Sequence, residues 1–168
     1  MDKILGHYKR IADYLACAGA YGAGLIMIRL LMAYEFGKAG IRKFNGQNWF
    51  GNVQDNFIFP FNVIPTELSW FMATWFEILG AFGLLLGLFT RFWAITLIVI
   101  SIVAISGVHW PAEWSGLGEL WESYRITKKD GSGNFRVPLL FIAMLMPLVF
   151  HGAGKLSIDN FLAKRFIK

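Results

Sequence analysis

The sequence predicts an all-α integral membrane protein, a four-helix bundle with two interfacial loops. The chain has 168 residues, of which 56% are hydrophobic and only 16% are charged, whereas about a quarter of an ordinary soluble domain is charged. The apolar residues gather in four long stretches, and a membrane helix needs about 20 such residues. A chain of this length suits one domain, covering 1–168.

Proline and polar residues mark the ends of the four expected helices. Thr66 follows Pro65 and is a suitable helix start, while Pro111 stops the third apolar run. Only Thr90-Arg91 separates the second run from the third, so these two helices should be antiparallel neighbours. The expected helices span roughly residues 18–41, 66–89, 92–110 and 136–156.

The distribution of Lys and Arg sets the expected orientation in the membrane. Four spans place both termini on one side, and basic residues are slightly more numerous there. Since basic loops stay inside, both termini are expected in the cytoplasm. The first apolar run exceeds the core of a signal peptide and contains Arg29, so it is expected to remain uncleaved.

Two long loops connect the helices. The first, Arg42–Pro65, carries many Phe and Trp residues, which either anchor it at the membrane interface or form a lid over a cavity. The second, Pro111–Phe135, has Leu117, Leu120, Trp121 and Tyr124 at helical spacing. This spacing predicts a short amphipathic helix on the membrane surface or against the bundle.

Composition argues against several classes of function. No basic cluster lies beside stacking aromatic residues, so no nucleic-acid partner is expected. The net charge of +5 is therefore interpreted as a determinant of orientation in the membrane. Cys17 is the single cysteine, which excludes an internal disulfide and an iron–sulfur cluster. His109 and His151 fall at opposite ends of the bundle, so a haem held by two histidines is not expected. Three scattered histidines and one cysteine make a poor tight metal site, which leaves a weak copper contact through His109 and methionines as the open alternative. Motifs for nucleophilic or nucleotide chemistry are missing as well.

Charged residues inside the apolar runs are the candidate functional residues. Arg29 and Glu77 each lie about 11 residues into their helices, which places both near mid-membrane. An unpaired charge at that depth is costly. An Arg29–Glu77 pair is therefore predicted, either as a structural clamp or as part of a site that binds a polar headgroup or relays protons.

Further polar residues gather toward the two ends of the bundle. Glu35 and Lys38 share a helix face. One interpretation is that they line an outward-facing pocket together with His109. The other is that Glu35 and Lys38 pair with each other, while His109 lies at the membrane interface. His151 and Lys155 are one helical turn apart near the cytoplasmic side. They form either a structural cap or part of a binding site.

Three glycines of the second helix, Gly80, Gly83 and Gly87, fall on one face. Small residues at such spacing let helices approach closely in lipid. This face serves either packing within the bundle or a homodimer.

Three motifs in order resemble the DoxX family. The first is Arg29–Tyr34 with Gly37, Gly40 and Lys43; the second is Glu77–Gly80 with Leu84–Arg91; the third is Gly152–Asp159. Val108-His109-Trp110 and Phe59-Pro60-Phe61 further resemble its HvfX branch. The resemblance implies a four-helix membrane protein. Related DoxD and DoxA proteins are linked to quinone-coupled thiosulfate oxidation and quinol oxidases, and HvfX-type members accompany maturation of copper-binding peptides.

The leading hypothesis is a redox-associated inner-membrane subunit that binds a quinone or quinol between the first, second and fourth helices. It would belong to a quinone-linked oxidoreductase complex with a protein partner. Catalytic candidates are Arg29, Glu77, Glu35, Lys38 and His109. Candidate quinone-binding residues are Arg29, Glu77, His151 and Lys155.

Two alternatives remain open. One is a non-catalytic membrane scaffold that recruits soluble partners, such as proteins that mature copper-binding peptides, through the aromatic loop or the amphipathic segment. The other is a transporter of a small solute or metal, for which four helices would need a dimer. The residues leave the substrate, and any catalysis by this chain alone, undecided.

Overall fold

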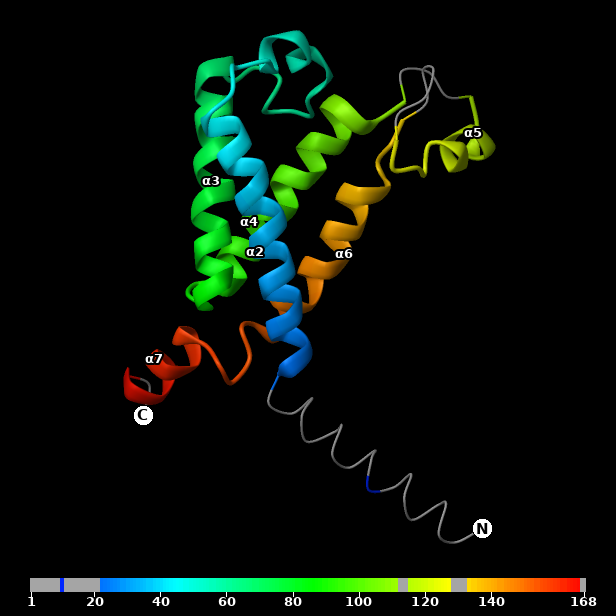
Figure 1. The fold of residues 1–168 in the computed structure, drawn as a ribbon. Helices are drawn as coiled ribbons and strands as arrows, with labels where there is room; N and C mark the ends of the chain where they lie inside the picture. The colour runs from blue at the N-terminus through cyan, green and yellow to red at the C-terminus, as the bar shows by residue number, and fades with distance from the viewer. Residues whose placement is uncertain (1–9, 11–21, 112–114, 128–132, 167–168) are drawn as a thin grey trace, which may run out of the picture.

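The computed structural model describes residue 10 and residues 22–111, 115–127 and 133–166, and these form helices and connecting loops without a strand. The all-helical prediction is thereby confirmed for the described residues. The start expected for the first helix, at residue 18, lies outside them. The helices are α2 (Ala23–Phe44), α3 (Thr66–Leu86), α4 (Thr90–Ala104), α5 (Leu117–Glu122), α6 (Arg136–His151) and α7 (Ile158–Phe166) (Figure 1). Short 3-10 turns, η1 (Phe50–Asn52) and η2 (Gln54–Asn56), lie in the first loop, and a π-helical turn, η3 (Ile105–His109), extends α4.

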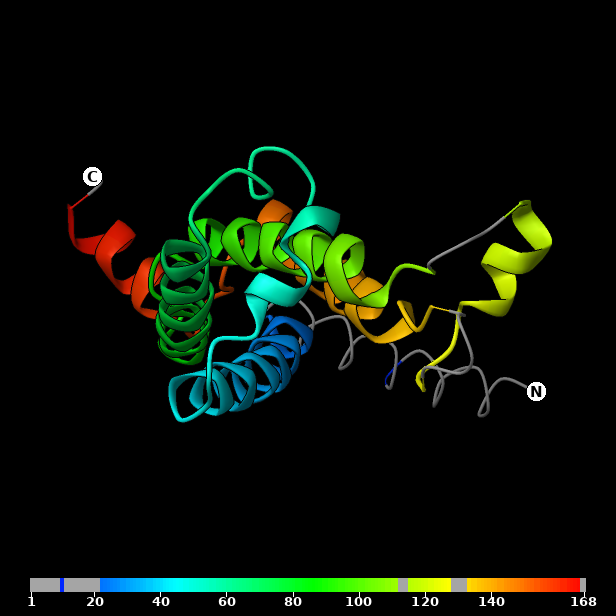
Figure 2. The ribbon, with the colours of Figure 1, turned by 90° about the horizontal axis from the view of Figure 1, so that it is seen from above.

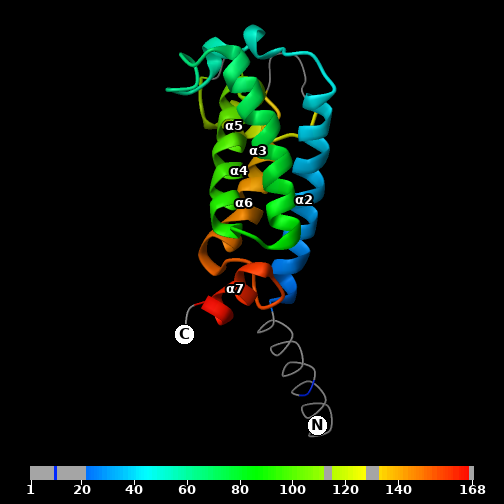
Figure 3. The ribbon, with the colours of Figure 1, turned by 90° about the vertical axis from the view of Figure 1, so that its left-hand side faces the viewer.

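Helices α2, α3, α4 and α6 pack side by side and are called the bundle here. α2 packs along α3, α3 along α4, and α4 along α6. In Figures 1 and 3 the start of α2, the α3–α4 turn and α7 lie at one end, called the lower end. The α2–α3 loop and the segment that carries α5 lie at the opposite, upper end. Seen from above, α5 stands away from the bundle (Figure 2).

The bundle is apolar both inside and outside. Its core is made by Met32, Ala33, Phe36, Ala81, Leu84, Ala94, Leu97, Leu145 and Leu148. On the outer faces, Phe71, Phe82 and Phe92 keep 58%, 60% and 56% of their surface exposed. Two helical segments, Thr66–Leu86 and Thr90–His109, are long and apolar enough to cross a membrane, and α6 is apolar but shorter.

Two predicted helix ends were wrong because glycine ends the helix earlier. α3 ends at Leu86, since Gly87 takes a left-handed conformation with φ of 66°. The turn therefore precedes Thr90 and Arg91, which form the first turn of α4. α6 ends at His151 instead of Leu156, because Gly152 has φ of 73°.

The opposite error occurred at the end of α2. The helix continues past Ile41 to Phe44, so Arg42 and Lys43 belong to its last turn instead of the loop. Basic side chains are favoured there because they face the helix's unpaired carbonyls. This extra turn places Lys43 inside the bundle.

α5 and α7 flank the bundle. The amphipathic segment predicted in the second loop is confirmed as α5, whose Leu117 and Trp121 are 81% and 75% exposed. Ser115 donates its amide and hydroxyl to the Glu119 carboxylate at 2.8 and 2.9 Å, which lowers the pKa of Glu119. α7 was not predicted, because its nine residues mix polar with apolar side chains and fall after the last apolar run.

Candidate functional site

A buried ion pair joins α2 to α3. The Lys43 ammonium lies 2.7 and 2.6 Å from the two carboxylate oxygens of Glu77, and the side chains are only 18% and 5% exposed. Gly40 permits the close approach, since a Cβ there would lie 2.7 Å from Ile78 Cγ1. The predicted Arg29–Glu77 pair was therefore wrong: the partner of Glu77 is Lys43.

This ion pair lies on the wall of a cavity of about 490 Å³, called the upper cavity. Ligand pockets in proteins fall in the same range of volume and are mostly apolar with a few placed polar groups. The cavity lies between α3, α4 with η3, and the first loop. Its lining residues are Lys43, Trp49, Phe50, Phe57, Phe61, Ser69, Met72, Ala73, Phe76, Glu77, Ile95, Thr96, Val99, Ile100, Val103, Ala104, Val108 and His109.

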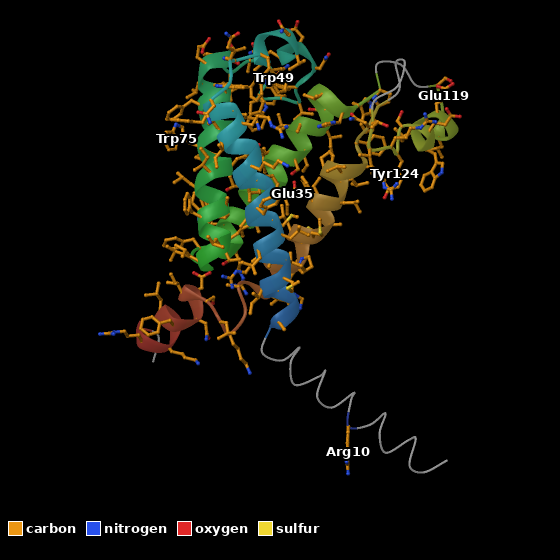
Figure 4. All side chains as sticks on the ribbon, viewed as in Figure 1. Arg10, Glu35, Trp49, Trp75, Glu119 and Tyr124 are labelled. Carbon is orange, nitrogen blue, oxygen red and sulfur yellow. The ribbon has the colours of Figure 1, made fainter. Side chains whose placement is uncertain are left out.

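Aromatic side chains of the first loop cover this cavity. Phe50 and Phe57 are 8% and 5% exposed and pack edge to face, with ring centroids 5.3 Å apart. Trp49 lies among the loop side chains at the upper end of the bundle (Figure 4). Gly107 leaves the space that the Phe57 ring of the loop occupies, because a Cβ there would overlap this ring. The lid interpretation of the first loop thus has geometric support, while Phe59, at 79% exposure, points outward.

His109 contributes a ring of defined orientation to the upper cavity. Its Nδ1 lies 2.8 Å from Asn134 Oδ1. The Asn134 amide is oriented by its own donation from Nδ2 to the Ile126 carbonyl at 3.2 Å. Nδ1 of the neutral ring therefore donates, which leaves Nε2 as the acceptor.

Ser69 adds an uncompensated hydroxyl. The residue is 6% exposed and lines the cavity, yet its Oγ has no hydrogen-bond partner within the described part of the chain. Buried polar atoms are normally paired. A ligand in the upper cavity would supply a partner for Ser69.

Arg29 has a different environment at the lower end. Its guanidinium donates to the carbonyls of Leu84 and Leu85 at 2.8 and 3.0 Å, and to those of Ala153 and Leu156 at 2.9 and 3.0 Å. The last carbonyls of a helix lack partners within the helix. Arg29, which is 4% exposed, therefore ties the end of α3 to the segment after α6 and lines neither cavity described here.

Asp159 completes this lower junction. Its carboxylate accepts the backbone amides of Phe89 and Thr90 at 2.8 and 3.0 Å, and its own amide donates to the Gly87 carbonyl at 2.9 Å. The start of α4 is thus capped by a residue of α7. The second and third motifs of the sequence meet at this junction.

Glu35 and Lys38 lie on α2 away from the upper cavity. Glu35 is half-buried near the middle of the helix (Figure 4), and Lys38 is exposed with its Nζ 5.8 Å from the centre of the Tyr34 ring. No salt bridge joins the two in the described structure. The prediction that they share a pocket with His109 was wrong, because His109 faces the cavity of Lys43 and Glu77 instead.

His151 and Lys155 line a second cavity, of about 740 Å³, at the lower end. The four residues predicted to bind a quinone are therefore separated. Glu77 belongs to the upper cavity, His151 and Lys155 belong to the lower one, and Arg29 belongs to the junction between α3 and the segment after α6. Across the described residues, no group of His, Cys, Asp or Glu side chains is arranged to hold a metal ion.

Lys43 is the residue that sequence reasoning missed. The buried face of α2 runs through Arg29, Ala33, Phe36 and Gly40, and Lys43 continues it at the same spacing of three or four residues. Extending that face by one turn identifies the partner of Glu77.

The glycine face of α3 is used within the chain. A Cβ at Gly80 would lie 3.1 Å from Leu97, and one at Gly83 would overlap Trp93, both residues of α4. These glycines thus serve packing of α3 against α4, which was the first of the two interpretations of the motif.

Comparison with known proteins identifies the family. Residues 24–110 match the DoxX family. The chain belongs to the DoxX family. It is also 35% identical over 143 residues to an uncharacterized protein of Haemophilus influenzae, with 85% of each chain covered. No solved structure matches it.

The matched region contains all the described residues that line the upper cavity. DoxX family proteins are membrane-associated, in agreement with the two apolar segments of α3 and of α4 with η3.

Proposed function

We propose that this DoxX protein is a multi-pass subunit of the bacterial inner membrane that binds a quinone or quinol in its upper cavity. It would serve a quinone-linked redox complex. In this arrangement α2, α3, α4 and α6 cross the bilayer, and the lower end faces the cytoplasm. The observation that carries the proposal is an apolar, aromatic-roofed cavity with a buried Lys43–Glu77 pair in its wall.

The chemistry of the lining suits a quinone headgroup. A quinone is a flat apolar ring whose two carbonyl oxygens need hydrogen-bond donors. The Lys43 ammonium has three N–H donors, and two are used by Glu77, so one remains for a ligand oxygen. The Ser69 hydroxyl is a second donor without a protein partner in the described structure. The aromatic side chains of the lid cover the ring.

The same residues can hold protons. A bound quinol supplies two electrons and two protons when it is oxidised. His109 Nε2 accepts one proton, since Nδ1 is engaged with Asn134, and the Glu77 carboxylate is a second acceptor. The electrons pass to a partner protein of the complex. Lys43, which bonds both oxygens of the Glu77 carboxylate, favours its charged form.

The test is the quinone content of the purified protein. We expect about one quinone per chain after extraction from a mild-detergent preparation, and loss of most of it in Lys43→Met. Lys38→Met is the matched control, because this exposed lysine lies on the same helix outside the upper cavity. Thermal unfolding of each variant verifies the fold. A folded wild-type protein that neither contains nor takes up quinone contradicts the proposal.

A scaffold is the second candidate, and the exposure of α5 favours it. Leu117 and Trp121 are 81% and 75% exposed on a helix that stands away from the bundle (Figure 2). A soluble partner protein would cover such a face. Replacing both residues with Ser should then release the partner in pull-down experiments and leave any bound quinone unchanged. Loss of quinone without loss of a partner would count against the scaffold.

A further inference from the structure

The lower cavity differs in character from the upper one. Three cationic or titratable basic side chains line it: Arg91 of α4, His151 at the end of α6, and Lys155 in the segment that follows. Its other lining residues are Gly22, Leu25, Phe89, Thr90, Phe92, Gly152, Ala153, Gly154, Ser157, Asp159, Asn160 and Ala163. The function proposed above makes no use of this cavity.

Hydrogen bonds to α6 hold two of the basic groups in place. Arg91 Nη2 donates to the Phe150 carbonyl at 3.3 Å, which leaves the rest of the guanidinium for another acceptor. His151 Nδ1 lies 3.2 Å from the Pro147 carbonyl and donates to it, so Nε2 is directed away from that carbonyl. Gly152 leaves room for this arrangement, since even a Cβ there would stay 3.6 Å from Arg91 Nε.

Asp159 offsets only part of the positive charge of the cavity. Its carboxylate accepts the backbone amides of Phe89 and Thr90, and it contributes one negative charge against the two positive charges of Arg91 and Lys155. Among the described residues no other acidic side chain lines the cavity, whereas Arg91, Lys155 and His151 all do. The cavity therefore favours an anionic ligand.

Thr90 provides an independent sign of a ligand. The residue is fully buried and lines the cavity, and its Oγ1 has no hydrogen-bond partner among the described residues. Its amide is used by Asp159, but its hydroxyl is left as an unused donor. Because buried polar groups are normally hydrogen-bonded, we expect this hydroxyl to bond a group outside the described structure, such as a ligand.

The position of the cavity indicates which anion is available. Phe89 and Phe92, 65% and 56% exposed, line it beside the apolar outer face of α4. α7 extends sideways from the same end (Figures 1 and 2), with Phe161 60% exposed and Lys164 and Arg165 in its last turn. Such a helix is typical of the plane between lipid headgroups and acyl chains. The cavity therefore opens where lipid phosphates lie.

We propose that the lower cavity binds the phosphate group of an anionic phospholipid. Arg91 and Lys155 pair with the phosphate oxygens, and charge-assisted bonds of this kind are stronger than neutral ones. The Thr90 hydroxyl donates to a further phosphate oxygen. Phe89 and Phe92 contact the upper part of the acyl chains. This site is independent of the quinone proposal, because it shares no residue with the upper cavity.

The test is a lipid titration of the detergent-purified full chain followed by native mass spectrometry. Phosphatidylglycerol and phosphatidylcholine with identical acyl chains are compared, and wild type should prefer the anionic lipid. A basic side chain near an anionic headgroup changes affinity about fivefold, so Arg91→Gln/Lys155→Gln should weaken phosphatidylglycerol binding about 25-fold. The control, Lys164→Gln/Arg165→Gln, removes the same charge from the same end and should change binding less than about twofold.

Equal losses in the two double variants would mean that surface charge alone attracts the lipid, and would overturn the proposal. Thr90→Val separates binding from folding, because a purely structural threonine with an unpaired hydroxyl should tolerate this change without any loss of lipid affinity. We expect Thr90→Val to bind phosphatidylglycerol several-fold more weakly while its lipid-free unfolding temperature is maintained. If inorganic phosphate binds and phosphatidylglycerol does not, the ligand is free phosphate and the lipid assignment fails.

Discussion

Lys43 and Glu77, which are 34 positions apart in the sequence, form an ion pair in which one ammonium bonds both carboxylate oxygens. The pair holds the last turn of α2 against the middle of α3. It also forms part of the wall of the upper cavity. Structural and chemical roles therefore coincide at these two residues, and experiments must separate them.

A mutant cycle across the Lys43–Glu77 pair is the first prediction. Removing one partner of a buried pair leaves the other charge uncompensated, which costs about 3–5 kcal/mol of unfolding free energy. We expect losses of that size in Lys43→Met and in Glu77→Leu. The double variant should recover most of the loss, because an apolar pair needs no compensation. Reversible unfolding in detergent measures all three, and simple additivity of the two losses would contradict the pairing.

Gly107→Ala tests the role of the first loop as a lid. The added Cβ would overlap the Phe57 ring and push the loop away from η3. Overpacking of this kind costs about 1–3 kcal/mol. We expect unchanged helix content by circular dichroism but reduced quinone retention.

Gly51→Ala, in the same loop, is the control for the lid, because a Cβ there meets nothing within 4 Å. It should leave quinone retention as in wild type. Equal quinone content in Gly107→Ala and wild type would mean that the loop does not enclose the ligand.

Arg29→Leu tests whether Arg29 is a ligand-binding or a structural residue. Four carbonyls lose their donor, and each buried unsatisfied group costs about 1–3 kcal/mol. We expect a loss of at least about 4 kcal/mol and an unchanged quinone content per folded molecule. Arg42→Leu, an exposed arginine on the same helix, should have little effect on either quantity. Selective loss of quinone from a stable Arg29→Leu protein would restore Arg29 to the binding site.

The sequence predicted the helical character of the chain well, because the apolar stretches are long and end in proline, glycine or polar residues. It failed at the pairing of charges. Depth along a helix axis brought Arg29 and Glu77 to the same level, but depth does not tell which neighbour a side chain faces. Arg29 is satisfied by backbone carbonyls at helix ends, and no side-chain pattern records such partners.

The upper cavity was predictable only in part. His109 and the aromatic first loop were identified from sequence, and both contribute to it. Lys43 was assigned to the loop, because the apolar run ends at Ile41 and the helix continues on polar residues. The loop's return onto Gly107 is a contact between distant segments, which composition and periodicity do not report.

Asp159 should act as a cap for α4 supplied by another helix. Phe89, the residue before α4, has φ of 50° and makes no side-chain cap, so the amides of Phe89 and Thr90 depend on the Asp159 carboxylate. Loss of a cap costs about 0.5–2 kcal/mol, and we expect Asp159→Ala to fall at the upper end of that range because two amides lose their acceptor. Hydrogen exchange at both amides should accelerate.

Asp55→Ala is the control for the cap, since Asp55 is an exposed carboxylate in the first loop at the opposite end of the molecule. It removes the same charge but caps no part of α4, so stability and amide exchange at the start of α4 should stay as in wild type. If Asp159→Ala left the exchange of the Phe89 and Thr90 amides unchanged, the start of α4 would be held by packing alone. The junction of α3, α4 and α7 would then depend on Arg29 without help from the carboxylate.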